Sequence, residues 1–173
     1  MIEIRTASPA SLSGPVLSSL TRMLDGLVRD GAALGWTAPP TRDEIEALLR
    51  GIADAPPGDA CAVLALEGQE VLGAGWWQRH ATPTQRQNAD LDKLAVAPHA
   101  SGRGLGRRIL RRLLAEADGA GIEHLTLDLR EGNEIAQRLY ASEGFREYGR
   151  LPGFVAPGDG TRCGKIFLVR ALG

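Results

Sequence analysis

The stretch LAVAPHASGRGLGRRILRRLL, residues 94–114, is the most specific feature of the chain. An apolar segment, Leu91–Ala97, is typical of a β-strand, and a helix with one apolar side is predicted from about Gly104 to Asp118. The turn between them contains three glycines: Gly102, Gly104 and Gly106. Glycine permits positive φ and close approach of a ligand to the backbone, and successive amides at a helix start bind anions. The sequence therefore predicts a phosphate-binding turn.

Three arginines lie next to the glycines, and the residues around them distinguish this turn from two other phosphate-binding turns. Arg103, Arg107 and Arg108 would add positive charge where a pyrophosphate binds. A P-loop needs a Gly-Lys-Ser/Thr ending, and this turn has no lysine. In a dinucleotide fingerprint the third glycine would fall on Arg107, whose side chain is too bulky for close packing of helix on strand. An ordinary glycine-rich turn between a strand and a helix stays the alternative.

A second pattern follows in LTLDLREGNEIAQRLYASEGFREYG, residues 125–149. It has five spaced positions: Asn133, Ala136, Tyr140, Gly144 and Phe145. Asn133 and Tyr140 are about two helical turns apart and so share one face of a predicted helix over Asn133–Ser142. Two other interpretations stay open, because Asn is a good N-cap and a Tyr beside Leu139 could be a core residue.

Together the two stretches resemble the GNAT (GCN5-related N-acetyltransferase) superfamily. Residues 101–106, SGRGLG, are similar to its motif A, R/Q-x-x-G-x-G/A, with Ser101 in place of the leading Arg or Gln. Residues 133–145 are similar to its motif B, N-x-x-A-x-x-x-Y-x-x-x-G-F. The motifs cover about Leu91 to Leu172, and the front half agrees in element order only. Residues 148–172 also resemble the end of the tabtoxin-resistance-type acetyltransferases.

The resemblance implies that acetyl-coenzyme A is the co-substrate, without a metal. The cofactor-binding residues it implies are Leu94, Ala95, Val96, Gly102, Arg103, Gly104, Leu105, Gly106, Arg107, Arg108, Asn133 and Tyr140. It further implies that the strand Leu94–Val96 binds the pantetheine arm through its main chain. That strand would be splayed from Leu125–Leu129, and Tyr140 would protonate the leaving thiolate.

Three acidic residues are candidates for the general base. Asp128 lies inside a strand beside the expected cleft, where an unpaired buried charge would be costly, so a catalytic role is one interpretation. Pairing of Asp128 with a nearby Arg is the other. Asp90 and Asp92 are two residues apart, so they point to the same face of a strand. There they would either take part in catalysis or be solvated at the start of the strand. Trp76 and Trp77 point to opposite faces of one strand, so we expect one in the core and the other in the acceptor pocket.

The remaining periodicities give the element order β-α-α-β-β-β-α-β-α-β-β. The predicted helices of the front half are Ser13–Leu34 and one that starts at Thr41 with a capping box, Thr41 and Glu44. The other predicted strands are residues 1–7, 60–67, 69–78, 124–129, 145–150 and 165–172, with loops at 79–88 and 151–160. We therefore expect an α+β protein with the GNAT fold, a mixed sheet of about seven strands and about four helices, forming one domain over residues 1–173.

Composition excludes several classes of function. The 173 residues are 43% hydrophobic and 24% charged, with a net charge of −1, which does not favour binding of nucleic acid or membrane. Nearly all basic residues are Arg, and the lysines are Lys93 and Lys165. Cys61, Cys163 and three histidines have no metal-ligand spacing. The start, MIEIRTASPASLSG, lacks a signal-peptide pattern, so we expect a cytoplasmic monomer or homodimer.

The function expected from these patterns is acetyl transfer from acetyl-coenzyme A to an amine of a small metabolite, antibiotic or toxin. Two alternatives are a protein acetyltransferase acting on a lysine or an N-terminus, and a coenzyme A-binding module without catalysis. An acid at Tyr140 favours catalysis, because a binding module does not need one.

Overall fold

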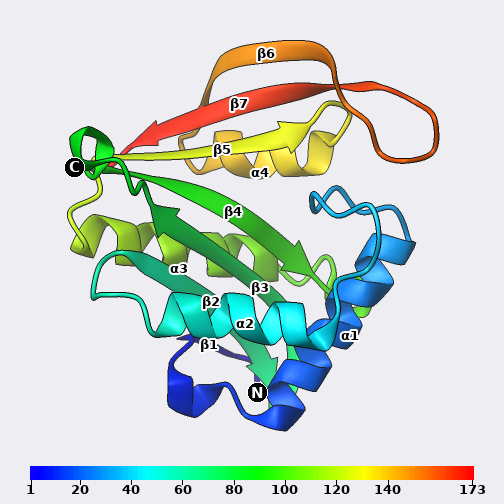
Figure 1. The fold of residues 1–173 in the computed structure, drawn as a ribbon, viewed down its shortest axis with the longest axis vertical. Helices are drawn as coiled ribbons and strands as arrows, with labels where there is room; N and C mark the ends of the chain where they lie inside the picture. The colour runs from blue at the N-terminus through cyan, green and yellow to red at the C-terminus, as the bar shows by residue number, and fades with distance from the viewer.

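A computed structural model describes residues 1–173. Its centre is one seven-stranded sheet with the order β1-β2-β3-β4-β5-β7-β6 (Figure 1). The strands are β1 (Glu3–Thr6), β2 (Ala60–Glu67), β3 (Glu70–Arg79), β4 (Asn88–Val96), β5 (His124–Arg130), β6 (Arg146–Val155) and β7 (Cys163–Ala171). The helices are α1 (Gly14–Arg29), α2 (Arg42–Ala53), α3 (Leu105–Gly119) and α4 (Glu134–Ser142). The predicted order of strands and helices is confirmed.

The sheet is mixed because one of its strand pairs is parallel. β4 and β5 run parallel, and every other neighbouring pair is antiparallel. The parallel pair is joined by α3, the helix that follows the glycine turn. A parallel connection needs such a crossover helix, and so the sequence 94–114 also determines the topology at the middle of the sheet.

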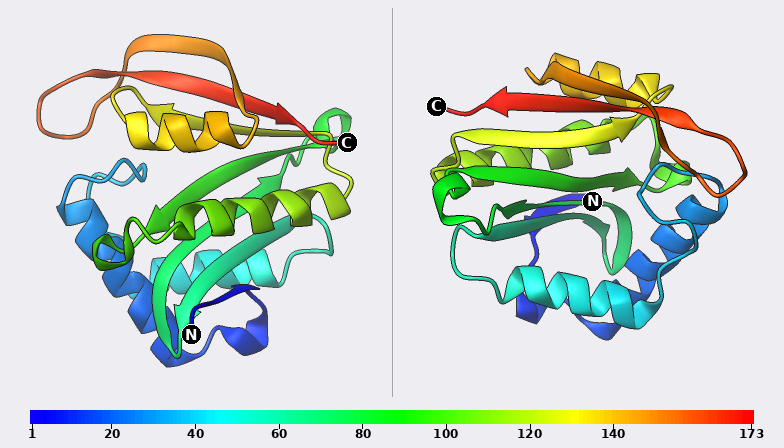
Figure 2. Two further views of the ribbon diagram at one scale, coloured as in Figure 1. Left: turned by 180° about the vertical axis from the view of Figure 1, so that it is seen from behind. Right: turned by 45° about the horizontal axis from the view of Figure 1, so that its top comes forward.

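Helices cover both faces of the sheet, as the two views of Figure 2 show. One apolar cluster joins α1 and α2 to β2 and β3, with Leu20, Leu49 and Trp76 at its centre. The second cluster joins α3 and α4 to the other face of the sheet, from β2 to β5 and β7, with Ile109 and Leu113 fully buried. The face of β5 and β7 opposite α4 carries polar side chains, and this uncovered face becomes part of the site described below.

The capping box at the start of α2 forms as predicted. The Thr41 amide donates to Glu44 Oε2 at 2.7 Å, and the Glu44 amide donates to Thr41 Oγ1 at 3.3 Å. Such a box satisfies two amides that the first helical turn leaves without partners.

Several predicted boundaries are wrong. The first helix ends at Arg29 and not at Leu34, because Gly31 adopts a φ of +80° and turns the chain away. β4 begins at Asn88 and not at Leu91, since Asn88, Ala89 and Asp90 pair with β5. Residues 151–155, the first half of the predicted Pro/Gly loop, belong to a strand, because β6 continues to Val155 along β7.

Trp76 and Trp77 do face opposite sides of β3, but neither lines a pocket. Trp76 belongs to the cluster under α1 and α2, and Trp77 belongs to the cluster under α3 and α4; each is 1% exposed. The Trp77 indole donates to the carbonyl of Leu113 at 3.1 Å. The expectation that one of them forms the acceptor pocket is wrong, because both faces of β3 are covered by helices.

None of the helices combines the length and the apolar character that crossing a membrane requires.

Candidate active site

The site begins where β4 and β5 separate. The two strands pair at three positions only: Asn88 with His124, Ala89 with Leu125, and Asp90 with Thr126. Beyond Asp90, β4 continues to Val96 along β3, whereas β5 continues to Arg130 along β7 (Figure 1). The strands therefore diverge, as the resemblance to the GNAT superfamily implies, and the edge of β4 that faces β5 has no strand partner from Leu91 to Val96.

A β-bulge lies directly at the point of divergence. Trp77 pairs with Leu91 and Trp76 pairs with Lys93, so Asp92 is an extra residue of β4 without a partner on β3. Bulges bend a strand and redirect its side chains. The bulge thus bends β4 where it leaves β5 and places the Asp92 carboxylate at the opening.

The first of two cavities occupies this opening and has a volume of about 540 Å³. Its walls are residues 91–96 of β4 and residues 128–133 at the end of β5, and Ala136 and Tyr140 of α4 close it. The cavity therefore runs along the free edge of β4 and reaches three residues of the motif B pattern, Asn133, Ala136 and Tyr140.

The second cavity, of about 790 Å³, lies on the uncovered face of β5 and β7. The loop after α1, residues 31–37, forms one wall, and residues 155–157 with Asp159 form another. Its charged lining residues are Asp90, Asp92, Lys93, Asp128, Arg130, Asp159 and Lys165.

The two cavities meet at a short set of shared residues. Residues 91–93 of β4, residues 128–130 of β5 and residues 32–34 of the loop after α1 line both of them. Asp90 lines only the second cavity, and Tyr140 lines only the first. Two carboxylates, Asp92 and Asp128, therefore lie at the junction of the cavities, together with Lys93 and Arg130.

Tyr140 combines burial with an unused hydroxyl. It is 7% exposed, its ring packs edge-on against Phe145 at 5.5 Å, and its hydroxyl makes no hydrogen bond within the protein. Burial raises the pKa of the Tyr140 phenol above its ordinary value, because the charged phenolate is disfavoured away from water. The phenol is thus a protonated donor at neutral pH, and its other predicted role, as a core residue, also holds for the ring.

Asn133 is the N-cap of α4. Its Oδ1 accepts from the Ala136 amide at 3.2 Å, which confirms the capping interpretation. The side-chain NH₂ group makes no hydrogen bond within the protein, and Asn133 also lines the first cavity. Its position is consistent with both interpretations made from the sequence.

The glycine turn presents free amides at the start of α3. Gly102 and Gly104 have φ of +76° and +72°, and a Cβ at either position would point into open space. No amide from residue 102 to 107 donates to a backbone carbonyl. Ser101 contributes no side chain to the loop, because its hydroxyl contacts the carbonyl of Ala97 at 3.5 Å. Open space, free amides and a helix N-terminus fit a pyrophosphate.

The three arginines of the turn have different partners. Arg107 is held by Glu143, 3.1 Å away, and by the Ser142 hydroxyl at 3.0 Å. Arg108 contacts the carbonyl of Ile2 at 3.4 Å. Arg103 makes no ion pair and no side-chain hydrogen bond within the protein, so it is the arginine of the turn that is free to meet an anion.

The three acidic candidates lie near one another and have different partners. Asp128 Oδ1 lies 3.0 Å from Lys165 Nζ, and its side chain is 48% exposed. The expected burial of Asp128 is therefore wrong, and its partner is a lysine and not an arginine. Its Oδ2 makes no contact of this kind. Asp92 accepts from Gln78 Nε2 at 3.1 Å.

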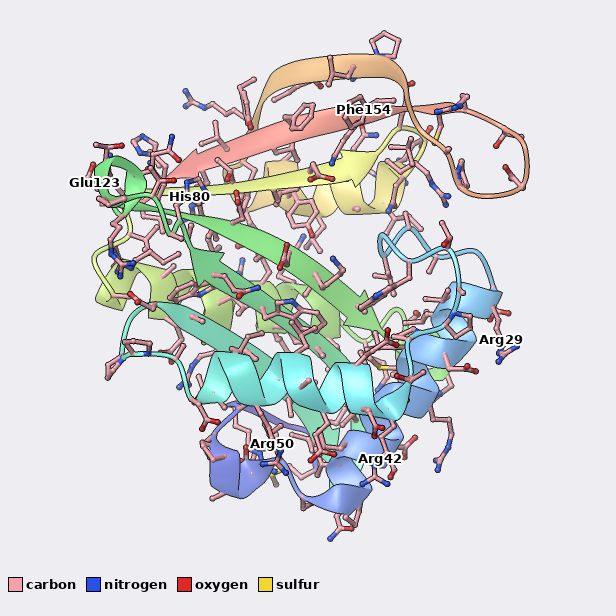
Figure 3. All side chains as sticks on the ribbon, in the orientation of Figure 1. Arg29, Arg42, Arg50, His80, Glu123 and Phe154 are labelled. Carbon is pink, nitrogen blue, oxygen red and sulfur yellow. The ribbon has the colours of Figure 1, made fainter.

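Asp90 closes the paired end of the opening. It accepts a hydrogen bond from the Thr126 hydroxyl, and His80 Nε2 lies 3.0 Å from Asp90 Oδ2 without the alignment of a hydrogen bond. Figure 3 shows His80 at the edge of the sheet near the start of β5. Asp90 thus has protein partners at the point where β4 and β5 part, and its carboxylate also lines the second cavity.

Sequence reasoning missed the three cations of the second cavity and the ring of Trp36, over which one of them lies. The cations are Lys93, Arg130 and Lys165. The available signal was composition: of 20 basic residues only two are lysines, and both lie here. No group of three or more His, Cys, Asp or Glu side chains is arranged to hold a metal ion.

Comparisons with known proteins agree with this geometry. The profile of the acetyltransferase (GNAT) family matches residues 28–145. The ribosomal protein bS18-alanine N-acetyltransferase of Haemophilus ducreyi is 34% identical over 89 residues, 51% of this chain and 61% of that protein. An uncharacterized N-acetyltransferase in the hisH-hisA intergenic region of Azospirillum brasilense is 32% identical over 120 residues, 66% of this chain and 68% of that protein.

Solved structures share the fold over nearly the whole chain. A Salmonella typhimurium protein, solved with its cofactor acetyl-CoA, has a TM-score of 0.86 and 21% identity, covering 100% of this chain and 95% of that one. A GNAT superfamily phosphinothricin acetyltransferase from Sinorhizobium meliloti, in complex with AcCoA, has a TM-score of 0.82 and 20% identity, covering 99% of this chain and 89% of that one.

Proposed function

Because this chain belongs to the acetyltransferase (GNAT) family, we propose that it transfers an acetyl group from acetyl-coenzyme A to the amine of a small molecule. The observation that carries the proposal is the divergence of β4 from β5 after Asp90, with a cavity in the opening. Residues from α1 to β7 line the two cavities, which supports one catalytic domain over residues 1–173.

The first cavity and the glycine turn would hold the acetyl donor. The amides of residues 102–107 would bind the pyrophosphate, with Arg103 as an additional cation. The free edge of Leu94–Val96 offers main-chain donors and acceptors, as a strand edge does to an added strand. Bound there, acetyl-coenzyme A supplies a thioester whose carbonyl carbon is open to attack by an amine.

Two kinds of residue would carry out the proton transfers. Asp128, whose Oδ2 is free, would accept the proton of the attacking amine directly or through water. Asp92 and Asp90 would attract the protonated amine to the second cavity. Tyr140 would donate its proton to the departing thiolate, since burial raises the pKa of the phenol and keeps the proton on it.

The second cavity would hold the acceptor. Its volume of about 790 Å³ lies in the range of small-molecule sites, and it is bounded by the loops at 31–37 and 155–159. These walls support a small molecule over a folded protein as the acceptor. The carboxylates at the junction suit a cationic amine.

The proposal can be tested by product analysis. The protein is incubated with acetyl-coenzyme A and a panel of primary amines, and acetylated amines are identified by mass spectrometry. We expect at least one small amine to be acetylated faster than in the absence of protein. Binding of acetyl-coenzyme A without acetylation of any amine would favour the binding-module alternative.

A second candidate acceptor is the N-terminal amine of a protein. It is favoured by the match to a ribosomal protein bS18-alanine N-acetyltransferase, although that match spans 61% of the relative. Peptides that begin with alanine belong in the same panel. A kcat/KM for such a peptide above that of every free amine would assign the protein substrate instead.

A further inference from the structure

Positive charge is concentrated on one side of the second cavity. Arg130 of β5 and Lys165 of β7 both line it, and these two residues pair directly across the β5–β7 ladder. Directly opposed residues of antiparallel strands project from the same face, and like charges at such positions are destabilising. A pair of this kind needs a counter-charge.

The acids of the protein offset the charge of this pair but use only part of its hydrogen-bond donors. Lys165 contacts one oxygen of Asp128, and an ammonium group has three donors. Arg130 donates from one nitrogen to the carbonyl of Gly31 at 2.9 Å, and a guanidinium has five donors. Asp159, the remaining acid of this wall, accepts two hydrogen bonds from Thr161, at 2.9 and 2.6 Å, and interacts with Arg130 through charge but makes no hydrogen bond to it. Arg130 and Lys165 therefore keep unused donors on the cavity wall.

Aromatic rings hold the lysine at this position. Lys165 Nζ lies 5.6 Å from the ring of Phe154 and 5.5 Å from that of Phe167. Tyr148 packs beside Phe167 at 5.9 Å. Figure 3 shows Phe154 on the β6–β7 hairpin, away from α1 and α2. Cation–π contacts of this kind fix an otherwise flexible side chain, so its charge stays at the cavity wall.

Both signs of charge line the junction of the two cavities, and Lys165 extends the positive charge of Arg130 into the second cavity. Asp92 and Asp128 line the junction with the first cavity, where the amine must meet the thioester. Lys165 lines the second cavity only. An acceptor with an ammonium group at the junction would therefore extend toward Lys165 with its other end.

We infer that the acceptor carries an anionic group, such as a carboxylate, in addition to its amine, and that Lys165 and Arg130 bind this anion. The inference rests on the proposed function and specifies its substrate class as zwitterionic amines. The rings of Phe167 and Tyr148 lie beside the anion site and would contact apolar atoms of the same molecule.

The test compares amino acids with their own amides as acceptors. The amide keeps the amine and side chain and removes the negative charge; it also makes the amine less basic, which by itself would favour the amide. We expect the wild type to show a higher kcat/KM for the amino acid. Lys165→Met, which keeps the length of the side chain, should lower the ratio of the two kcat/KM values by about tenfold or more, as expected for loss of a hydrogen bond to a charged group.

Arg162→Met is the matched control. Arg162 is exposed, lies three residues before Lys165 and does not line the cavity, so the ratio should stay at the wild-type value. Equal kcat/KM values of the wild type for amides and amino acids would overturn this inference but not the proposed function. The same holds if Lys165→Met leaves the ratio of the two kcat/KM values unchanged. Failure to acetylate any amine or peptide would overturn the proposed function and this inference with it.

Discussion

Asp90 of β4 and Thr126 of β5 form the last paired position between the two central strands, and the Thr126 hydroxyl donates to the Asp90 carboxylate. The next residues of β4 include the bulged Asp92, and the next residues of β5 include Asp128. One geometric event, the parting of two strands, therefore opens a cavity and places two carboxylates at its edge. The proposed chemistry depends on this arrangement.

Gly104→Val should abolish donor binding. Acetyl-coenzyme A should raise the Tm of the wild type, because a ligand that binds only the folded state at 100 times its Kd stabilises it by about 2.7 kcal/mol. A side chain at Gly104 would occupy the space beside the free amides, so the variant should lose most of this Tm rise in a thermal-shift assay.

Gly68→Val is the control for backbone strain. Gly68 in the β2–β3 turn has a φ of +62°, also has open space around it, and lies outside both cavities. Both variants should lower the Tm of the free protein, but only Gly104→Val should lose the response to ligand. An equal response in the two variants would show that the glycine turn does not bind the donor.

Tyr140→Phe should affect catalysis and not binding. The change keeps the ring packed on Phe145 and removes the proton that the buried phenol retains because its pKa is raised. General acids contribute about 10²- to 10⁴-fold, so kcat should fall by about 100-fold or more while the KM for acetyl-coenzyme A changes little. Wild-type turnover in Tyr140→Phe would mean that the thiolate takes its proton elsewhere.

Asp128→Asn should change the dependence of rate on pH. For the wild type, kcat/KM should rise with pH and then level off, because the amine must lose a proton before it attacks. Asn cannot accept that proton, so the plateau should fall by about 100-fold while donor binding is kept. Asp90→Asn and Asp92→Asn should act mainly on the acceptor KM. A pH profile of Asp128→Asn that matches the wild type would place the base elsewhere.

Gly75→Ala should destabilise the sheet beside the site. A Cβ at Gly75 would lie 2.9 Å from the carbonyl oxygen of Lys93 and 2.9 Å from Leu113 Cδ1, so β4 or α3 must shift. Overpacking of this kind costs about 1–3 kcal/mol. Gly26→Ala, in the interior of α1 with open space around it, should instead stabilise by about 0.5–1 kcal/mol. Urea denaturation of the two variants measures both effects, and equal free energies of unfolding would contradict the packing described for Gly75.

The features that could be predicted from the sequence are those determined by residues close together along the chain. The glycine turn, the capping box of α2 and the order of elements follow from local spacing, and all three are present. The end of α1 was missed because the apolar pattern continues to Leu34, which is buried from a loop and not from a helix.

The acceptor side depends on contacts between distant segments. The pair of Asp128 and Lys165 arises from the register of β5 on β7, and the bulge at Asp92 arises from the pairing of β4 with β3. Neither register is encoded in a local pattern. The sequence could therefore predict the glycine turn and the acids that line the cavities, but not the cations of the second cavity.

The central claim is that the two cavities hold a donor and an acceptor of one acetyl group. The direct measurement is coenzyme A release from acetyl-coenzyme A, followed by thiol titration, with the acetylated amine quantified in the same reaction. We predict that coenzyme A release depends on the amine, equals the acetylated amine in amount, and falls by about 100-fold in Tyr140→Phe. Coenzyme A release that does not depend on an amine, or that Tyr140→Phe leaves unchanged, would contradict the account.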